Sequence, residues 1–265
     1  KALLFTSEHA KQAVICTDDE WGMKLAEECK IPNTTVGQNG NWKTSEATSN
    51  SSGATTQQIT IDNDAPISLS VNMLGSYNAT NAACALAASQ FLGLSIPVSL
   101  ESLKNVRPIP GRLEKVSIAS PGTAFVDYAH TPDAVATVLT VIKEANPEKI
   151  ITVIGCGGDR DSSKRPLMGK VAAQLSDIVI ITDDNPRSED PTAIRSAMMA
   201  GTQDCSAEVI EIADRRTAIA KALSLANFGD VIAILGKGHE TGQEIAGEVF
   251  PFDDRVVARQ ESENV

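Results

Sequence analysis

The stretch TAFVDYAHTPDAVATVLTVIKEANPEKIITVIGCGGDR, residues 123–160, decides the fold of this chain. A branched apolar run at residues 123–127 predicts a buried strand, and a second such run at residues 149–154 predicts another. Between them, Thr131 is a suitable N-cap and Pro132 a suitable first residue for a helix that we expect to end near Ala145. Strand, helix and strand in this order predict a parallel βαβ unit.

The same alternation continues toward the C-terminus. We expect further strands at residues 178–182, 209–212 and 231–235, and helices at residues 166–175, from Pro191 capped by Asp190, and at residues 214–226. A hairpin and a helix around residues 247–260 close the pattern. Continuous Val and Ile runs separated by amphipathic helices predict a doubly wound α/β domain whose mostly parallel sheet is covered on both faces.

The first hundred residues are less regular. A strand is expected at residues 13–16, with helices at residues 19–30, 78–92 and 100–105. Residues 38–58 are rich in Ser, Thr, Asn and Gly, so we expect an exposed loop or a weak hairpin without chemistry there. Two prolines stiffen the segment 107–111, and we place a domain boundary between Arg107 and Pro108.

Composition excludes several classes of protein. Among 265 residues, 23 Lys and Arg against 34 Asp and Glu give a net charge of −11, which argues against binding of a nucleic-acid backbone. No apolar run approaches the ~20 residues of a membrane span. Five cysteines without a C-x-x-C pair indicate neither a disulfide framework nor a zinc site, and fit a reducing cytoplasm. The chain opens at Lys1 without Met, and we treat it as a fragment.

Polar, cation-bearing loops follow four of the expected strands. In open α/β sheets, ligands bind outside the carboxyl ends of the strands, where the chain leaves for the next helix. The sequence therefore predicts one ligand site, formed by the segments 127–130, 155–160, 183–187 and 236–240.

The glycine-rich segment 155–160 has no standard nucleotide motif. Arg160 occupies the place of the third glycine in G-x-G-x-x-G, and no P-loop sequence occurs in the chain. Glycines allow a close backbone approach to a ligand, while Arg160, Lys164 and Arg165 offer cations to a carboxylate or phosphate. A tight turn before a solvated, basic helix start is an equally good interpretation.

The segment D-N-P-R at residues 184–187 also has two interpretations. Pro186 fixes the backbone so that the amide of Asn185 and the guanidinium of Arg187 can face the same carboxylate. Local sequence alone favours an Asx turn at the end of a strand. Similarly, Glu240 either receives an ammonium group or is simply exposed.

The remaining chemical groups give weaker signals. Asp127 with His130 suggests a catalytic dyad, but the sequence places no serine or cysteine beside them. Cys156 has no evident partner base, and we do not expect a cysteine nucleophile. Asn78 and Asn81 either cap a helix or aim amides at a ligand.

Together, seven motifs occur in the order found in one enzyme family. The chain resembles the Mur ligases, and within them the members that add meso-diaminopimelate, over nearly its whole length apart from residues 38–58. The motifs are GSYNATN (75–81), PGRLE (110–114), DYAHTPD (127–133), GCGGDRD (155–161), KRPLM (164–168), TDDNPR (182–187) and GKGHE (236–240).

The resemblance implies that residues 1–107 are the C-terminal part of a central ATPase domain, and that residues 108–265 are a Rossmann-like domain that brings the amino acid. It implies an ATP-dependent ligase of cytoplasmic peptidoglycan precursor synthesis. This enzyme would add meso-diaminopimelate to UDP-N-acetylmuramoyl-L-alanyl-D-glutamate through an acyl phosphate. The P-loop and the UDP pocket are absent from the chain, so we expect this piece alone to be inactive.

The resemblance also implies residue roles. Lys1 would carry a carbamate that helps hold Mg²⁺, and His130 would lie near the phosphates of ATP. The expected ATP contacts are Asn78, Asn81, Arg112 and Asp127. The expected diaminopimelate contacts are Arg160, Asp184, Asn185, Arg187, Gly236 and Glu240. We expect a monomer that binds no nucleic acid.

Three alternatives stay open at this point. A lysine-adding ligase of the same family is the nearest, and the D-N-P-R segment argues against it. A noncatalytic nucleotide-binding module of the same fold is another, disfavoured by the presence of Arg112, Asp127 and His130. A Rossmann-type dehydrogenase is disfavoured because the glycine fingerprint is absent.

Overall fold

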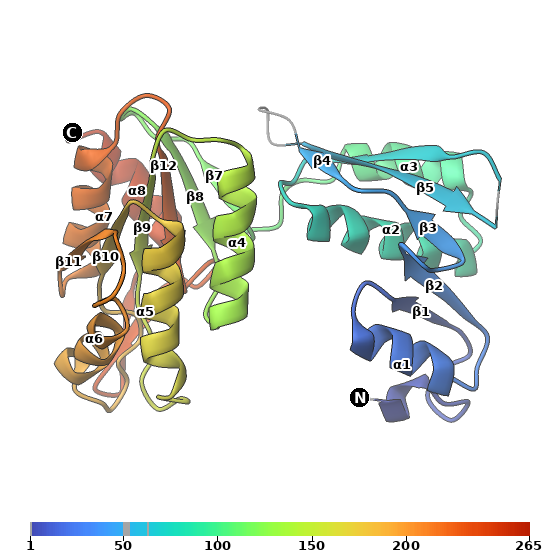
Figure 1. The fold of residues 1–265 in the computed structure, drawn as a ribbon, viewed down its shortest axis with the longest axis horizontal. Coiled ribbons are helices and arrows are strands. Elements are labelled where there is room, and N and C mark those ends of the chain that lie inside the picture. The colour runs from blue at the N-terminus through green and yellow to red at the C-terminus, as the bar shows by residue number, and fades with distance from the viewer. Residues whose placement is uncertain (1, 50–53, 63) are drawn as a thin grey trace. The chain divides into compact units, whose positions relative to one another are not determined.

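The computed structural model describes residues 2–49, 54–62 and 64–265, and the chain divides into two compact units, Lys1–Pro108 and Ile109–Val265 (Figure 1). The division falls one residue after the boundary that we placed between Arg107 and Pro108. Each unit has its own sheet and its own helices.

The second unit is built on a six-stranded sheet with the order β11-β10-β9-β12-β8-β7. All neighbouring strands are parallel except β7, which pairs antiparallel with β8. The mostly parallel sheet expected from the sequence is therefore confirmed. The strands are β7 (Glu114–Val116), β8 (Thr123–Asp127), β9 (Ile150–Ile154), β10 (Ile178–Ile181), β11 (Glu208–Glu211) and β12 (Val231–Leu235).

Helices cover both faces of this sheet, as the doubly wound prediction requires. In Figure 1, α4 (Pro132–Glu144) and α5 (Lys164–Leu175) lie in front of the sheet, and α6 (Pro191–Ala200) packs against α5. Behind it, α7 (Arg215–Leu225) and α8 (Asp254–Ser262) pack against each other. One buried cluster joins apolar residues of α7 and α8 to alternate residues of the strands, which is the pattern of a single sheet face.

Local capping sets where the helices begin. The Thr131 side chain accepts a hydrogen bond from the Ala134 N–H, with Pro132 in the first turn of α4. Asp190 and Asp214 cap α6 and α7 in the same way. Such caps satisfy backbone donors that the helix itself leaves free. The expected caps of α4 and α6 are therefore confirmed.

A buried ion pair joins the last elements of the second unit to the sheet. After the hairpin β13 (Gly242–Ile245) and β14 (Glu248–Pro251), Asp254 begins α8. Its carboxylate accepts two hydrogen bonds of 2.8 Å from Arg215 at the start of α7. Both side chains are fully buried, and Arg215 also donates to the carbonyl of Leu235 at the end of β12. Loss of one partner would leave an uncompensated buried charge.

The first unit contains a mixed sheet with the spatial order β1-β2-β3-β5-β4, and β6 also pairs with β5. The strands are β1 (Ala13–Cys16), β2 (Asn33–Gly37), β3 (Trp42–Thr44), β4 (Thr48–Ser49), β5 (Thr55–Ile61) and β6 (Ile67–Val71). Of the exposed loop or weak hairpin expected at residues 38–58, the hairpin agrees with β4 and β5, which pair antiparallel. The third strand there, β3, was not expected, and it also pairs with β5. Within this region, Trp42 is buried in the core of the unit and Thr55 is also buried, so the expected exposure is wrong for both. An antiparallel strand needs apolar residues on only one face, so a polar composition concealed the strands.

In the described part of this unit, the α-helices that accompany the sheet are α1 (Glu20–Glu28), α2 (Ser76–Phe91) and α3 (Ile96–Lys104). Asp19 caps α1, since its side chain accepts a hydrogen bond of 2.6 Å from the Gly22 N–H. The buried face of α2 includes Ala79, Ala83 and Leu86, and α2 contacts four strands of the sheet. Across the described parts of both units, no helix is long and apolar enough to cross a membrane.

Candidate functional site

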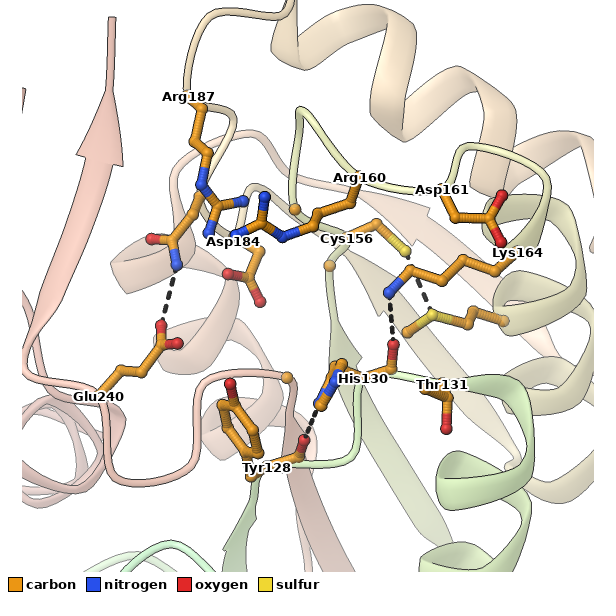
Figure 2. A pocket seen from close by; sticks show the side chains of 15 residues that line it. Tyr128, His130, Thr131, Cys156, Arg160, Asp161, Lys164, Asp184, Arg187 and Glu240 are labelled. Atoms are coloured by element: carbon orange, nitrogen blue, oxygen red, sulfur yellow. Dashed lines mark hydrogen bonds between the residues drawn. The ribbon is translucent and has the colours of Figure 1, made fainter. Parts of the chain in front are cut away.

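Loops that follow β8, β9, β10 and β12 line a cavity of about 370 Å³ at the carboxyl edge of the parallel sheet (Figure 2). This edge is where we predicted a ligand site. All six residues expected to contact an amino acid line the cavity, as does His130. They are Arg160, Asp184, Asn185, Arg187, Gly236 and Glu240.

Groups of both charges face this cavity. Arg160, Arg187 and Lys164 provide cations, and Asp161, Asp184 and Glu240 provide carboxylates. A purely anionic ligand would meet repulsion from the carboxylates, and a purely cationic ligand would meet it from the arginines. The lining therefore favours a small ligand that carries both charges.

The carboxylate of Asp184 accepts no hydrogen bond from the described residues. Its closest charged partner is Lys237, whose Nζ lies 3.7 Å from Oδ1, and no described residue donates a hydrogen bond to either oxygen. Gly236 passes beside it with φ of +114°, and a Cβ at that position would stand 2.5 Å from Asp184 Oδ2. Glycine is therefore required for the close approach of the β12 loop to this carboxylate.

Asn185 and Glu240 form a direct contact across the cavity. Asn185 Nδ2 donates to Glu240 Oε2 over 2.9 Å, as drawn in Figure 2. Asn185 Oδ1 accepts from the Nζ of Lys237 at 2.8 Å and from the backbone N–H of Glu244 at 3.0 Å. The side chain of Asn185 is thus held by three groups from outside its own loop.

Arg187 is held in an unusual backbone conformation. Its φ is +52°, a region that costs a non-glycine residue roughly 1–3 kcal/mol. Its N–H donates to the carbonyl of Glu244, and its carbonyl accepts from the N–H of Ala246, so the turn is joined to the β13 hairpin. The guanidinium donates to Glu244 Oε2 over 3.0 Å and to the Gly158 carbonyl over 2.8 Å. The D-N-P-R segment is therefore both a turn and part of the cavity wall.

The two cavity arginines flank the glycine-rich loop after β9. A Cβ on Gly157 would lie 2.9 Å from Arg187 Nη1 and 4.0 Å from Arg160 Cγ. Figure 2 shows both guanidinium groups pointing over the cavity, on the side of Asp184. Two neighbouring forks of this kind suit a carboxylate, which accepts paired hydrogen bonds.

Asp127 and His130 do not form a dyad. Both Asp127 oxygens accept backbone hydrogen bonds, from Leu113 at 2.6 Å and Ala129 at 2.7 Å. His130 Nδ1 instead lies 2.8 Å from the carbonyl oxygen of Tyr128. Burial raises the pKa of Asp127 although these backbone donors and the Arg112 guanidinium lower it. The weak signal for a hydrolytic triad is not supported by this geometry.

Cys156 is a packed core residue at the base of the cavity. Its side chain is buried, and Sγ lies 3.4 Å from the sulfur of Met168. Burial raises the pKa of its thiol to about 12. A thiol with so high a pKa is a poor nucleophile at neutral pH, in agreement with our expectation for this cysteine.

The residues expected to contact ATP lie in both units. In the first unit, Asn78 is buried and donates to the Leu74 carbonyl, whereas Asn81 is exposed on α2. In the second unit, the Arg112 guanidinium lies 5.2 Å from the ring centre of Tyr128, and Asp127 is bonded as described above. Their roles toward ATP stay predictions.

The expected magnesium site falls on Lys1, which lies outside the described residues. Within residues 2–49, 54–62 and 64–265, no group of three or more His, Cys, Asp or Glu side chains is arranged to hold a metal ion. The role of Lys1 and its carbamate stays a prediction.

Sequence reasoning missed two residues that shape the cavity. Lys237 lies within the G-K-G-H-E motif, and nothing in the sequence indicated that its side chain is buried beside Asn185 and Glu240. Glu244, which holds Arg187, lies on β13, and nothing in the sequence showed that this hairpin returns to the β10 loop.

The fold and the cavity define an α/β ligand-binding domain whose site lies at the carboxyl edge of a parallel sheet. Residues 1–89 match the family described as "Mur ligase middle domain", and residues 111–238 match "Mur ligase, glutamate ligase domain". The chain belongs to the Mur ligase family.

The similar proteins include two named UDP-N-acetylmuramoyl-L-alanyl-D-glutamate–2,6-diaminopimelate ligase. The one from Streptomyces avermitilis is 39% identical over 98% of this chain and 53% of its own length. The one from Nitrosomonas europaea is 40% identical over 98% of this chain and 54% of its own length. The chain thus spans about half the length of these curated relatives.

Solved structures show the same fold. A structure titled with the same ligase name is 33% identical, covers 99% of this chain and 55% of its own chain, and has a TM-score of 0.64. The UDP-N-acetylmuramate-alanine ligase of Thermotoga maritima has a TM-score of 0.69 at 21% identity, covering 99% of this chain and 54% of its own. This second likeness supports the fold alone.

Proposed function

We propose that this chain is the amino-acid-binding part, and a portion of the ATP-binding part, of a ligase that adds meso-diaminopimelate to UDP-N-acetylmuramoyl-L-alanyl-D-glutamate. The observation that carries the proposal is the cavity lined by Arg160, Arg187, Asn185, Asp184 and Glu240. The names of the relatives at about 39–40% identity support the same reaction.

Meso-diaminopimelate carries an ammonium and a carboxylate at each end, which suits a cavity with both charges. In the proposed binding mode, Asp184 and Glu240 receive the ammonium of one end, and Arg160, Arg187 and Asn185 receive its carboxylate. The amino group at the other end is left free to react. Burial of complementary charges with good hydrogen-bond geometry would fix the orientation of the amino acid.

The proposed chemistry begins with activation of the peptide substrate. A carboxylate is a poor electrophile at neutral pH, so its oxygen first takes the terminal phosphoryl group of ATP and becomes an acyl phosphate, with release of ADP. The free amine of the bound amino acid then attacks the carbonyl carbon. The amide bond forms, phosphate leaves, and the amine loses a proton. The cavity residues contribute by holding this amine in one orientation.

The nucleotide side of the proposal rests on residues from both units. We propose that Asn78, Asn81, Arg112 and Asp127 contact ATP, with the two asparagines near the base and Asp127 near the ribose. We also propose that His130 lies near the phosphates. Magnesium would neutralise phosphate charge when bound, with Lys1 as a carbamate among its ligands. The described residues supply no complete ligand set, so no step is assigned to the ion.

Selectivity would come from the far end of the amino acid. Lysine lacks the second carboxylate, so its binding would leave the guanidinium groups and the Asn185 amide without an acceptor. Sites built to bond a polar group reject analogues that lack it, because buried donors are left unpaired. This argument favours the diaminopimelate ligase over a lysine-adding enzyme.

Release of phosphate by the whole protein tests the proposal. The full-length enzyme is given ATP, the UDP-linked dipeptide and one of three additions: meso-diaminopimelate, lysine or buffer. We expect phosphate release with diaminopimelate only. If phosphate is released when lysine is added but not when diaminopimelate is added, the protein is the lysine-adding ligase. If the protein binds ATP but releases no phosphate under any of the three conditions, it is a noncatalytic module.

The proposed reaction also implies a location. A UDP-linked precursor and ATP are cytoplasmic substrates, and the five cysteines, all free in the structure, suit a reducing compartment. We therefore propose a cytoplasmic enzyme. The monomeric state stays a prediction.

A further inference from the structure

Lys237 is a buried lysine that contacts residues lining the cavity. It follows the apolar strand β12, and its side chain is 0% exposed. A buried ammonium is costly unless it is paired and hydrogen-bonded. Its Nζ lies 2.8 Å from Asn185 Oδ1, 3.3 Å from Glu240 Oε2 and 3.7 Å from Asp184 Oδ1. All three partners are proposed ligand contacts.

The bonds of Lys237 determine which way the Asn185 amide points. An ammonium and a backbone N–H can only donate, and both Lys237 and Glu244 meet the same side of this amide. The amide oxygen must therefore face them, and the amide nitrogen faces Glu240. The reversed amide would oppose donor to donor at two contacts and set its oxygen against the Glu240 carboxylate.

The neighbouring buried cation cannot replace Lys237. Arg215 is also fully buried, but its guanidinium donates twice to Asp254 and once to the Leu235 carbonyl. It is therefore committed to holding α7 and α8 to the sheet. Lys237 is the buried cation that contacts the cavity residues directly.

We propose that Lys237 is a positioning residue that sets the selectivity of this site for an amino acid with a second carboxylate. It keeps the Asn185 nitrogen available as a donor to that carboxylate, and it holds the Glu240 carboxylate in place for the ammonium. This inference rests on the proposed function. Without Lys237, the amide oxygen keeps one donor, the backbone N–H of Glu244, so the amide orientation is held less firmly. The reversed amide, whose oxygen would repel the ligand carboxylate, then becomes more accessible.

The first test replaces the ammonium with an apolar group of similar length. In the full-length enzyme, Lys237→Met should raise the KM for meso-diaminopimelate roughly 10- to 100-fold, the range typical for loss of a residue that orients a ligand contact. The KM for ATP and kcat should change by less than about 3-fold. The preference for diaminopimelate over lysine in kcat/KM should fall by a similar factor. Lys221→Met, on the exposed side of α7, is the matched control and should leave all of these values unchanged.

A double variant separates positioning from a general structural effect. If Lys237 acts through Asn185, Lys237→Met should raise the KM for diaminopimelate much less in an Asn185→Ala background than in the wild type. Equal effects in both backgrounds would overturn the proposal. Lys237→Gln keeps a donor toward Asn185 and should have a KM between those of the wild type and the Met variant, whereas a KM equal to that of Lys237→Met would also overturn it.

Two outcomes distinguish this inference from the proposed function. A folded wild-type enzyme that does not use diaminopimelate would remove the proposed function itself. A wild type that uses diaminopimelate, with an unchanged KM in Lys237→Met, would remove only the role of Lys237. Thermal melting of each variant reports folding, and if Lys237→Met does not fold, Lys237→Gln takes its place in the same cycle.

Discussion

The parallel strands β8 and β10 of the second unit each lead to an aspartate at the carboxyl edge of the sheet. These two aspartates, Asp127 and Asp184, have different surroundings. Asp127 ends β8, and both of its oxygens accept short backbone hydrogen bonds. Asp184 follows β10, lines the cavity, and has one ion pair of 3.7 Å with Lys237. Both residues are buried, with Asp127 4% exposed and Asp184 7% exposed.

The difference shows that position on the sheet edge does not decide the role of an acid. Asp127 has already satisfied one acceptor site on each oxygen within the protein, so its first role is to fix the loops at residues 113 and 129. Asp184 keeps its oxygens free of hydrogen bonds from described residues, which suits a ligand that brings donors. A contact between Asp127 and ATP must therefore use the remaining lone pairs of the carboxylate oxygens, those that do not accept the Leu113 and Ala129 N–H groups.

The largest effect is expected on the β10 side, at Arg187. In the full-length enzyme, Arg187→Ala should raise the KM for meso-diaminopimelate by about 30- to 1000-fold. The bound ligand's carboxylate would lose its proposed guanidinium partner inside the cavity, and such a loss costs about 2–4 kcal/mol. The KM for ATP should stay near normal. Steady-state phosphate release at varied amino-acid concentration measures both values.

Arg216→Ala is the matched control for this variant. Arg216 lies on α7, is 47% exposed, pairs with Glu261 and does not line the cavity. It should leave the KM for diaminopimelate unchanged. An unchanged KM in Arg187→Ala would remove Arg187 from the binding site and weaken the assigned role of the β10 loop.

A smaller effect is expected at Asp184. Asp184→Asn removes the charge but keeps the shape, and should raise the KM for diaminopimelate roughly 10-fold to 100-fold, since a charged hydrogen bond contributes about 1.5–3 kcal/mol. The free energy of unfolding should change by less than about 1 kcal/mol, because Lys237 keeps Asn185 and Glu240 as partners. Kinetics and urea unfolding together test this. A large loss of stability with a normal KM would reverse the assignment.

The opposite result is expected at Asp127. Asp127→Ala leaves the buried N–H groups of Leu113 and Ala129 without acceptors, and each such loss costs about 1–3 kcal/mol. We expect the free energy of unfolding to fall by about 2–4 kcal/mol in urea titrations. The KM for diaminopimelate should change little, because Asp127 does not line the cavity. Asp133→Ala, at an exposed position on α4, is the control and should lose much less stability.

The sequence predicted the second unit much better than the first. Long branched runs such as Ile150–Ile154 are buried on both faces, so every residue contributes to the signal. In β3, only Trp42 and Thr44 are buried, and a three-residue alternation is too short to recognise. The cavity residues were found because each follows a strand of a parallel sheet. The contacts that hold them, such as Arg187 with Glu244, join residues 57 positions apart and depend on tertiary packing.

The smallest expected effect concerns the pH dependence of stability at Asp127. Burial raises the pKa of this carboxyl above its ordinary value of 3.8, so the folded state binds the proton more tightly than the unfolded state does. The stability from this shift is therefore complete below about pH 3.8 and is lost as the pH rises through the folded pKa. Asn does not titrate, so the stability advantage of the wild type over Asp127→Asn should shrink as the pH rises above about 3.8 in urea titrations. An advantage that grows with pH would mean that the hydrogen bonds from Leu113 and Ala129 outweigh burial. The pKa of Asp127 would then be lowered, and its carboxylate would be an even stronger anchor for the backbone at the end of β8.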